Sequence, residues 1–549
     1  MKFWKYIIGV AGVALLISAF FAQQLGLDHN SDWGWQRVAM LALGLFFVFM
    51  SIVEIVSPNT LTHIARSCKL DYSIQINVFS LLAIIVVSAI YFWFFLPFIS
   101  ASPTTDNYTR MALSFKEGHL YLPEQPPAAL LSLKNPYNWG ERYSIRRTFT
   151  MDVSLYNGRF YLYWGPVPSL LLTVFSEEQL QKMGDQHVFF AFLYGLFLYS
   201  ALLVRSFWKK VNPSFPAWMI GVALLAIGLT GPSVKMLNLM QIYEAAIAGS
   251  QFFFIGGFYW AYSALQTKPM SVWKIALASL HWALAIGTRV TVAPAVGFLV
   301  LLVLFQLWQE RKFHVRLIRP ISAVLAPLLI LAISLGWYNY ARFGSVTEFG
   351  LRYQLAQVDY NEFTKVFSTD YLPENFRNYF LRPFVSQPKF PFLQAVEIIY
   401  SNERMTGLLY TTPLFLIVLI ALGRLLYSKA VVQKIREFIQ EGMSAESWLA
   451  LGLAGSSLIV MAVVLLYYYP AIRFSDEFLP SLMLLAVMSL WAGADIFAGN
   501  VILRRSYLAL VTALVLYSIT VSILLAIPFD RTREALLLIK PLQQLFGFR

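Results

Sequence analysis

Long apolar runs, separated by short polar stretches, dominate this sequence. A helix needs about 17 to 25 such residues to cross a hydrocarbon core about 30 Å thick. The run 165–176 is apolar but too short to cross, so we expect it to be interfacial or re-entrant. The pattern predicts about thirteen membrane spans, at 5–25, 37–57, 77–99, 187–207, 215–232, 245–265, 272–288, 291–309, 320–340, 407–427, 447–469, 478–497 and 506–528.

Composition agrees with an all-α polytopic membrane protein. Hydrophobic residues make up 58% of the chain and charged residues only 13%, against roughly 25% charged in soluble domains. No Gly/Ser-rich linker or charge block divides residues 1–549, which we interpret as one integral membrane domain. Two polar stretches, 100–186 after the third span and 341–406, are long enough to be large loops.

Basic residues predict the orientation, because short cytoplasmic loops carry an excess of lysine and arginine. One set of alternate loops holds most of them. The short loops of the other set hold only Arg37, Lys235, Arg289 and Arg473. We therefore expect a cytoplasmic N-terminus in the plasma (inner) membrane, with 100–186, 341–406 and the C-terminus outside. The excess of basic residues in cytoplasmic loops, together with attraction to anionic lipids, explains the net charge of +13. A nucleic-acid partner is therefore not expected.

Ionisable residues gather at the outer ends of the predicted helices. A transporter would place ionisable residues along a path through the bilayer. In the middle of the predicted spans His281 is the only clear case, and we interpret it as a residue that forms an interhelical hydrogen bond. The distribution favours a site at the outer membrane surface. Its members are Asp106, Asp152, Glu244, Arg289, Arg342, Glu348, Arg473, Asp476 and Glu477.

Asp106 is the first candidate for catalysis. It precedes a helical pattern at Tyr108, Met111 and Phe115, and Gly118 would end that helix. The residue suits an N-cap. It also suits a general base that takes a proton from a hydroxyl or amine attacking an anomeric carbon. One carboxylate can fill both roles.

The other charged candidates also have two interpretations each. Glu244 starts a helix, where an acid suits the helix dipole, and Asp152 could be a plain loop residue. Arg289 and Arg473 could reach lipid headgroups, or Arg473 could pair with Asp476 three residues later. The functional interpretation of both arginines is phosphate capture by the guanidinium fork.

Aromatic residues accompany these charges. The stretch 337–350, which contains Arg342, is typical of an aromatic belt at the outer interface and could also wall a site. The stretch 158–168 combines Gly158, Tyr161, Tyr163 and Trp164 with two prolines.

Two of these segments resemble the C-type superfamily of polyprenyl-phosphate-dependent glycosyltransferases. The segment 106–118 resembles the acidic motif that follows a helix in the family's first large outer loop, and 158–168 resembles the later Gly/aromatic/Pro stretch. The plan is similar to that of protein mannosyltransferases, the aminoarabinose transferase of lipid A and rhizobial lipopolysaccharide transferases. Three features depart from it: Asn107 replaces a second acid, the prolines are spaced Pro-Val-Pro, and two spans precede the helix leading to Asp106.

The resemblance implies an inverting glycosyltransferase of the cell envelope. Asp106 would be the base, and Arg289 or Arg473 would bind the phosphate of a lipid-linked sugar donor. The acceptor would be a glycan, a lipid or a protein. Membrane lipids are further partners, and no cofactor is expected, since Asn107 weakens the case for a divalent metal. We expect the substrates to contact Asp152, Tyr161, Tyr163, Trp164, Glu244 and Arg342.

Two other classes stay open on the sequence. An O-antigen ligase or polymerase would share the many spans, the large outer loop and the outer arginines. A lipid-linked oligosaccharide flippase or another transporter would need polar residues across the bilayer, which are sparse here.

Overall fold

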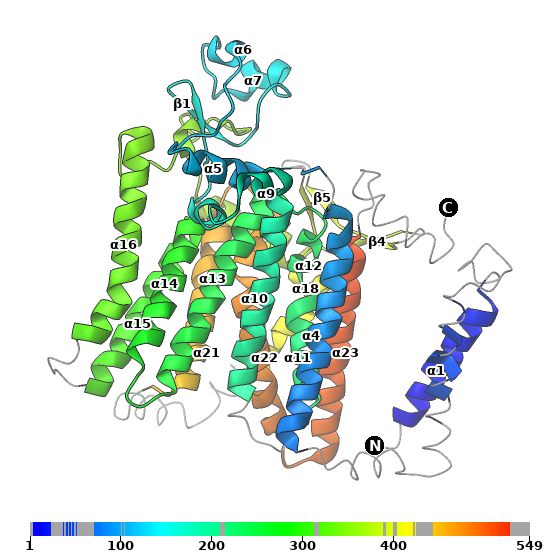
Figure 1. Cartoon of the computed structure of the whole chain (residues 1–549). Coiled ribbons are helices and arrows are strands. Elements are labelled where there is room, and N and C mark those ends of the chain that lie inside the picture. The colour runs from blue at the N-terminus through cyan, green and yellow to red at the C-terminus, as the bar shows by residue number, and fades with distance from the viewer. Residues whose placement is uncertain are drawn as a thin grey trace. The chain divides into compact units, whose positions relative to one another are not determined.

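Helices form most of the described structure, and strands occur only in short two-stranded hairpins (Figure 1). The chain divides into two compact units, Met1–Leu81 with Ile527–Arg549, and Leu82–Ala526. The first contains α1 (Trp4–Phe20). The computed structural model describes residues 4–22, scattered positions between 37 and 51, 71–99, 102–103, 105–208, 215–311, 318–387, 391–398, 403–420, 423 and 443–527.

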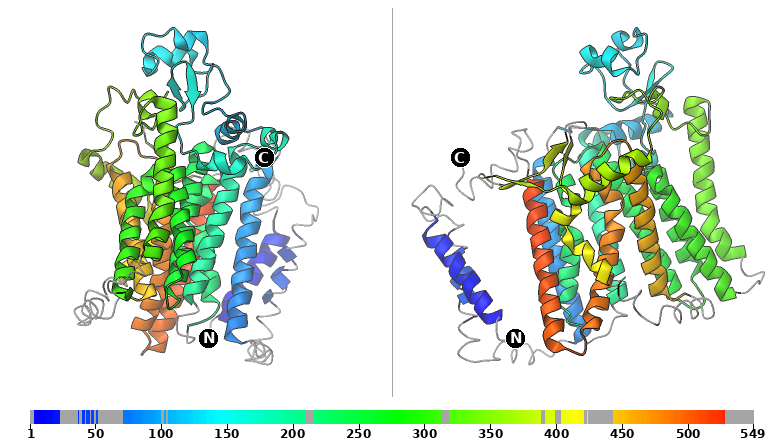
Figure 2. Two further views of the ribbon diagram at one scale, coloured as in Figure 1. Left: turned by 60° about the vertical axis from the view of Figure 1, so that its left-hand side comes forward. Right: turned by 180° about the vertical axis from the view of Figure 1, so that it is seen from behind.

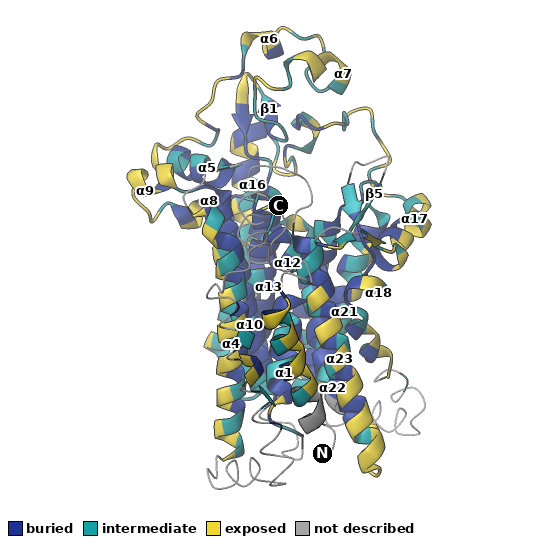
Figure 3. Cartoon of the chain, turned by 90° about the vertical axis from the view of Figure 1, so that its right-hand side faces the viewer, coloured by how far each residue is buried: buried dark blue, intermediate teal, exposed yellow. Residues whose placement is uncertain are grey.

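Long apolar helices identify a membrane protein. In the described residues, seven helices are long and apolar enough to cross a bilayer. Several present apolar side chains outward, such as Ile85 of α4 at 54% exposure and Ile502 of α23 at 76% (Figure 3), as contact with lipid requires. The seven are α4 with η1 (Tyr72–Phe95 and Leu96–Phe98), α10 (Asp185–Trp208), α15 (Ala293–Arg311), α16 (Ile318–Phe343), α21 (Ala445–Leu466), α22 (Leu479–Ile496) and α23 (Val501–Ala526).

Three further helices occupy predicted spans of the second unit. α11 (Met219–Leu229) and α14 (Val272–Thr288) are apolar but shorter than the seven. α13 (Ile242–Leu265) packs along α10 and α14, and most of its residues are buried. Gly257 permits this close packing, because a Cβ there would collide with the indole of Trp282 on α14.

Two of the predicted spans are not seen as continuous helices: one lies almost wholly outside the described residues, and the described part of the other is interrupted. The span 37–57 lies almost wholly outside the described residues. The described part of 407–427 is interrupted, with α18 (Leu408–Thr411) followed by η8 (Pro413–Leu416). Thr412 leaves the helical region at φ −145° and ψ 54°, because a proline disfavours helical geometry in the residue before it. The apolar run 165–176 forms only the short α8 (Val167–Leu172).

The first large loop, 100–186, which the basic residues predict to lie outside and which we therefore name the first outer loop, contains short helices and one hairpin at one end of α10, α13 and α16 (Figures 1 and 2). Asn157 and Gly158 have φ angles of 47° and 68°, as a two-residue hairpin turn requires. Its elements are α5 (Asn107–Lys116), α6 (Ala128–Leu131), α7 (Trp139–Arg142), η2 (Tyr143–Ile145), β1 (Ser154–Tyr156), β2 (Arg159–Tyr161), α8 and α9 (Glu177–Lys182).

The second outer loop, 341–406, pairs with the first through the backbone. The amide of Leu355 donates to Val153 O at 2.9 Å, and Ser154 forms an isolated bridge with Gln354. Its elements are η5 (Leu351–Tyr353), η6 (Thr369–Tyr371), α17 (Leu372–Phe376), η7 (Arg377–Leu381), β3 (Val385–Ser386), β4 (Leu393–Gln394), β5 (Val396–Ile398) and β6 (Glu403–Met405).

The packing of α13 on α14 gives a test of the fold. Gly257→Ala should lower the free energy of unfolding by about 1–3 kcal/mol, because the added methyl group overpacks the contact with Trp282. Gly297→Ala on α15 is the matched control, since nothing lies within 4 Å of a Cβ there. Thermal unfolding in detergent measures both. Equal melting temperatures for the two variants would contradict this account of the packing.

Candidate functional site

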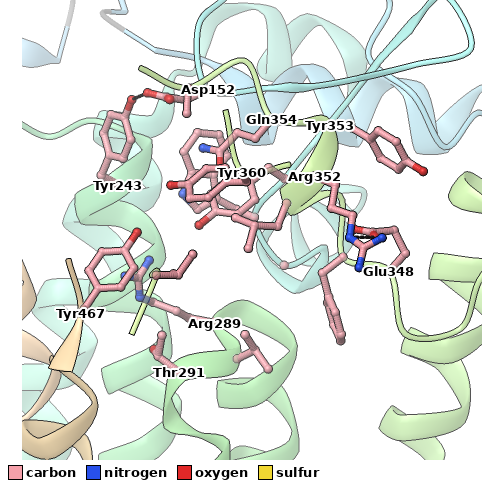
Figure 4. Close-up of a pocket in the computed structure, with 18 of the residues that line it drawn as sticks. Asp152, Tyr243, Arg289, Thr291, Glu348, Arg352, Tyr353, Gln354, Tyr360 and Tyr467 are labelled. Atoms are coloured by element: carbon pink, nitrogen blue, oxygen red, sulfur yellow. Dashed lines mark hydrogen bonds and ion pairs between the residues drawn. The ribbon is translucent and has the colours of Figure 1, made fainter. Parts of the chain in front are cut away.

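A cavity of about 1140 Å³ lies where the two outer loops meet the ends of the membrane helices (Figure 4). α13 begins beside it, whereas α14, α16 and α21 end beside it. Tyrosines and two tryptophans, Trp139 and Trp164, contribute to its wall. In the described part of the chain, its charged lining consists of Arg289, Arg342, Arg352, Arg473, Asp152, Glu348, Glu403 and Glu477.

Arg289 and Glu477 form one buried ion pair of this cavity. Arg289 follows the last turn of α14, and its Nε and one terminal nitrogen lie 2.8 and 2.6 Å from Glu477 Oε1. The hydroxyl of Thr291 donates to the other carboxylate oxygen at 2.6 Å. Burial opposes the charge of Arg289, but Glu477 outweighs it and raises the pKa of the guanidinium. The guanidinium of Arg289 is therefore protonated and fixed in position at the end of α14, and its charge is balanced by Glu477.

Arg473 pairs with Glu403 of the second outer loop at 2.8 Å. Its guanidinium also lies over the ring of Tyr243, 4.9 Å from the centroid. Burial opposes the charge, whereas Glu403 and Glu244 raise the pKa of Arg473. The prediction that Arg473 pairs with Asp476 is wrong, because both belong to η9 (Ile472–Glu477) but have partners on different elements.

Asp476 is buried beside α12 (Pro232–Met236) instead. Its Oδ1 accepts a hydrogen bond from the hydroxyl of Ser233 at 2.8 Å. Burial raises the pKa of Asp476 to about 8. The residue does not line the cavity.

Asp152 places a carboxylate directly in the cavity wall. Its backbone has a left-handed φ of 59°, which costs free energy in a residue other than glycine. The Tyr243 hydroxyl at the start of α13 donates to this carboxylate, and the side chain of Gln354 lies close enough to favour its ionised form. Burial raises the pKa of Asp152, while the bond from Tyr243 and the charge of Arg473 act in the opposite direction. Asp152 is thus a positioned acid rather than a plain loop residue.

Arg342 differs from the other two buried arginines of the cavity. Its terminal nitrogens donate to Leu162 O and to Asn339 Oδ1, each at 2.8 Å. Its guanidinium lies 3.7 Å from the centroid of the Tyr338 ring. No carboxylate of the described residues lies within ion-pair distance of it, so none of them pairs its charge.

The Gly/aromatic/Pro stretch forms part of the wall. Tyr163 and Trp164 line the cavity, whereas Tyr161 does not and packs its ring 5.3 Å from that of Phe343. Gly165 lies against the end of α14, where a Cβ would collide with backbone carbonyl oxygens. The stretch can approach the helix this closely only because that residue is glycine.

Glu244 has the structural role that a helix start favours. It is buried, and its Oε2 accepts from the backbone amide of Gln241 at 3.1 Å in a capping box. It does not line the cavity. Its expected contact with substrate is therefore not supported by its position, although its charge acts on Arg473.

Asp106 occupies the N-cap position of α5 but does not cap the helix with its side chain. Its carboxylate is 40% exposed and lies 2.8 Å from Arg110 Nε. Asp185, at the start of α10, instead accepts hydrogen bonds from the amides of Asn107 at 3.0 Å and Tyr108 at 3.1 Å. The helix thus begins after Asp106 as expected, but the side chain that caps its first turn belongs to Asp185. Asp106 does not line the cavity, and its role as base stays a prediction.

Several residues of the site were not predicted from the sequence, among them Tyr243, Gln354 and Glu403. Tyr243 bonds to Asp152, Gln354 lies close to the same carboxylate, and Glu403 pairs with Arg473. Tyr243 adjoins the predicted acid Glu244, which could have drawn attention to it. Gln354 and Glu403 carry no comparable signal, because only the folding of the second outer loop brings them to the cavity.

The described residues contain no group of three or more His, Cys, Asp or Glu side chains that could hold a metal ion. No family model matches the sequence, and no curated protein or solved structure gives a significant match.

The cap of α5 gives a matched test of two aspartates. Asp185→Ala should destabilise the first outer loop by about 1–2 kcal/mol, because two buried amides lose their acceptor. Asp106→Ala should cost at most about 1 kcal/mol, since it removes a partly exposed ion pair. Limited proteolysis within 105–186 measures the difference. Faster cleavage in the Asp106 variant than in the Asp185 variant would reverse the assignment.

Proposed function

We propose that this chain is a membrane glycosyltransferase that moves a sugar from a polyprenyl-phosphate donor to an acceptor outside the cytoplasm. The observation that supports it best is the cavity at the helix ends, which combines a positioned carboxylate, Asp152, with buried arginines and an aromatic wall. The resemblance of 106–118 and 158–168 to C-type glycosyltransferases points the same way.

The arginines suit the leaving group of such a reaction. A polyprenyl-phosphate sugar carries one negative charge, and a second develops on the phosphate as the bond to the sugar breaks. Arg342 offers a positive charge that no described carboxylate pairs. Arg289 and Arg473 are held in place by their glutamates. Fixed cations facing a developing charge stabilise the transition state without reorganisation.

Asp152 is the carboxylate that the geometry favours as the base. It would take the proton of an acceptor hydroxyl while the hydroxyl oxygen forms a bond to the anomeric carbon. The bond from that carbon to the phosphate oxygen breaks, the electron pair leaves with the polyprenyl phosphate, and the anomeric configuration inverts. Asp106 is the alternative base, but its carboxylate pairs with Arg110 outside the cavity lining.

The proposal includes the topology expected from the sequence. The fold would be of the C-type plan, with about thirteen spans in the plasma (inner) membrane. The N-terminus would be cytoplasmic and both large loops would lie outside. Membrane lipids would contact the apolar faces of the helices, and the donor would reach the cavity from the bilayer. No resident cofactor takes part in the proposed reaction.

The base assignment is tested by sugar transfer from labelled polyprenyl-phosphate sugars in proteoliposomes supplied with envelope extract. Asp152→Asn should lower the transfer rate by about 10²–10⁴-fold, the usual contribution of a general base. Asp370→Asn, an exposed acid of the second outer loop that pairs with Lys365, is the control and should transfer at the wild-type rate. Loss of activity in Asp106→Asn alone would return the role of base to Asp106.

The same assay distinguishes the rival classes. Use of diphosphate-linked oligosaccharide donors, with no use of monophosphate-linked sugars, would indicate a ligase or polymerase. Movement of a lipid-linked sugar across the vesicle membrane with no covalent transfer would indicate a flippase.

The pH dependence follows from the environment of Asp152. Burial raises its pKa above the ordinary value of about 3.9, and only the ionised form can accept a proton. Transfer should therefore decline on acidification with a midpoint above that ordinary value. In Tyr243→Phe the midpoint should move further upward, because the ionised carboxylate loses a hydrogen bond. An acid limb of kcat that is identical in both proteins would contradict this role of Tyr243.

A further inference from the structure

The cavity has more room than one sugar phosphate needs. Pockets for drug-sized ligands usually measure about 300–1,000 Å³, and this one measures about 1140 Å³. Arg289, Thr291 and Tyr467 lie on one side of it, and Glu348, Arg352 and Tyr353 lie on the other (Figure 4). Such a two-sided space can hold a donor and an acceptor together.

We call the second side the acceptor arm and define it by its residues. Trp139 of α7 belongs to this side because its neighbours hold α7 against the second outer loop. Arg142 of the same helix donates to Ala356 O, and the ring of Tyr137 lies 6.2 Å from that of Tyr353. The acceptor arm consists of Trp139, Glu348, Arg352, Tyr353 and Gln354, all of which line the cavity.

Gln354 offers a vacant hydrogen-bond acceptor in this arm. The residue is 6% exposed, its side chain lies close enough to Asp152 to lower the pKa of that carboxyl, and its Oε1 has no partner in the described part of the chain. An unsatisfied buried acceptor is costly, and a hydroxyl of a ligand would satisfy it. Asp152 presents a second acceptor beside it. Two neighbouring acceptors fit two hydroxyls on adjacent carbons, whereas a serine or threonine side chain offers one hydroxyl.

Tyr353 supplies a rigid aromatic surface next to these acceptors. Its ring packs against Tyr156 at 4.6 Å and Phe343 at 5.5 Å between centroids, so little conformational freedom remains to be lost on binding. Aromatic faces attract the polarised C–H groups of a pyranose ring. At the rim, Arg352 is 73% exposed and lies 3.9 Å from Glu348, which provides donors and acceptors for the outward hydroxyls of a sugar.

We propose that the acceptor is a carbohydrate chain whose terminal sugar presents a vicinal diol to Asp152 and Gln354 and stacks on Tyr353 and Trp139. The inference rests on the proposed function for the role of Asp152 as base. It excludes a serine or threonine side chain as the acceptor.

Equilibrium binding tests the inference separately from catalysis. The probes are fluorescently labelled oligosaccharides of two to eight sugars, released by mild acid from the membranes of the source cells. Anisotropy is measured with the full chain in detergent. At least one size fraction should bind, and periodate oxidation, which cleaves vicinal diols, should abolish its binding. Tyr353→Ala and Gln354→Leu should each weaken binding about tenfold, which corresponds to about 1.4 kcal/mol.

Tyr371→Ala is the control, because Tyr371 belongs to the same outer loop, bonds to Lys365 O and does not line the cavity. Its affinity for the oligosaccharides should equal that of the wild type, and the melting temperature of each variant confirms that it is folded. Unchanged affinity in both arm variants, binding that survives periodate, or displacement by a threonine-rich peptide would overturn the inference. So would the absence of binding by every fraction.

Release of donor sugar separates this inference from the proposed function. Donor hydrolysis without oligosaccharide binding would support a glycosyltransferase and overturn the carbohydrate acceptor. Diol-dependent oligosaccharide binding without any use of the donor would support the acceptor arm and overturn the proposed function.

Discussion

The backbone pairing between the two outer loops is the constraint on which the site depends. Leu355 exchanges hydrogen bonds with Val153 at 2.9 Å and Asp152 at 3.3 Å, and the Ser154 hydroxyl adds a bond to Gly350 O at 2.8 Å. Each bond contributes only about 0.5–1.5 kcal/mol. Together they bring Asp152 and Gln354 side by side, although about two hundred residues separate them in the chain. Loss of this pairing would leave each loop folded locally but would dismantle the cavity.

Buried charge sets the second constraint. Arg289 with Glu477 and Arg473 with Glu403 are largely buried pairs, and removal of one partner from such a pair typically costs about 3–5 kcal/mol. Substitution of either arginine would thus disturb the fold together with any phosphate contact. Arg342 is a cleaner probe of anion binding, since the partners described for it are neutral oxygen atoms and aromatic rings.

The sequence predicted the long apolar helices, whose length and composition are set by contact with lipid. The runs at 187–207, 320–340 and 506–528 correspond to α10, α16 and α23, because hydrophobicity over a long window reports the length of a spanning helix. The interruption at Thr412 was missed, although Pro413 marks it. A long apolar run conceals such a local break.

The sequence could not predict which charged side chains pair with each other. Asp106 has the position and chemistry of an N-cap, but the side chain that accepts from the first helical amide is that of Asp185, 78 residues beyond Asn107. Arg473 and Asp476 are close in the chain, yet one pairs with the second outer loop and the other with α12. The sequence predicted which polar residues gather at the helix ends. Only the tertiary fold decides which of them meet.

The direction of the helices at the cavity favours arginines at their ends. α14, α16 and α21 end at the cavity, so their last carbonyl groups give this region a partial negative potential. An anion would be repelled there, in contrast to phosphate sites at helix N-termini. Arg289 directly follows α14 and Arg342 lies in the last turn of α16, where cations are stabilised by the same carbonyls. The helix ends stabilise these arginines, and Arg342, whose charge no described carboxylate pairs, can offset the negative potential of the carbonyl groups. At the ends of α14, α16 and α21, a bound phosphate would therefore be held by these side chains rather than by the helix backbone, whereas α13 begins at the cavity and is the exception.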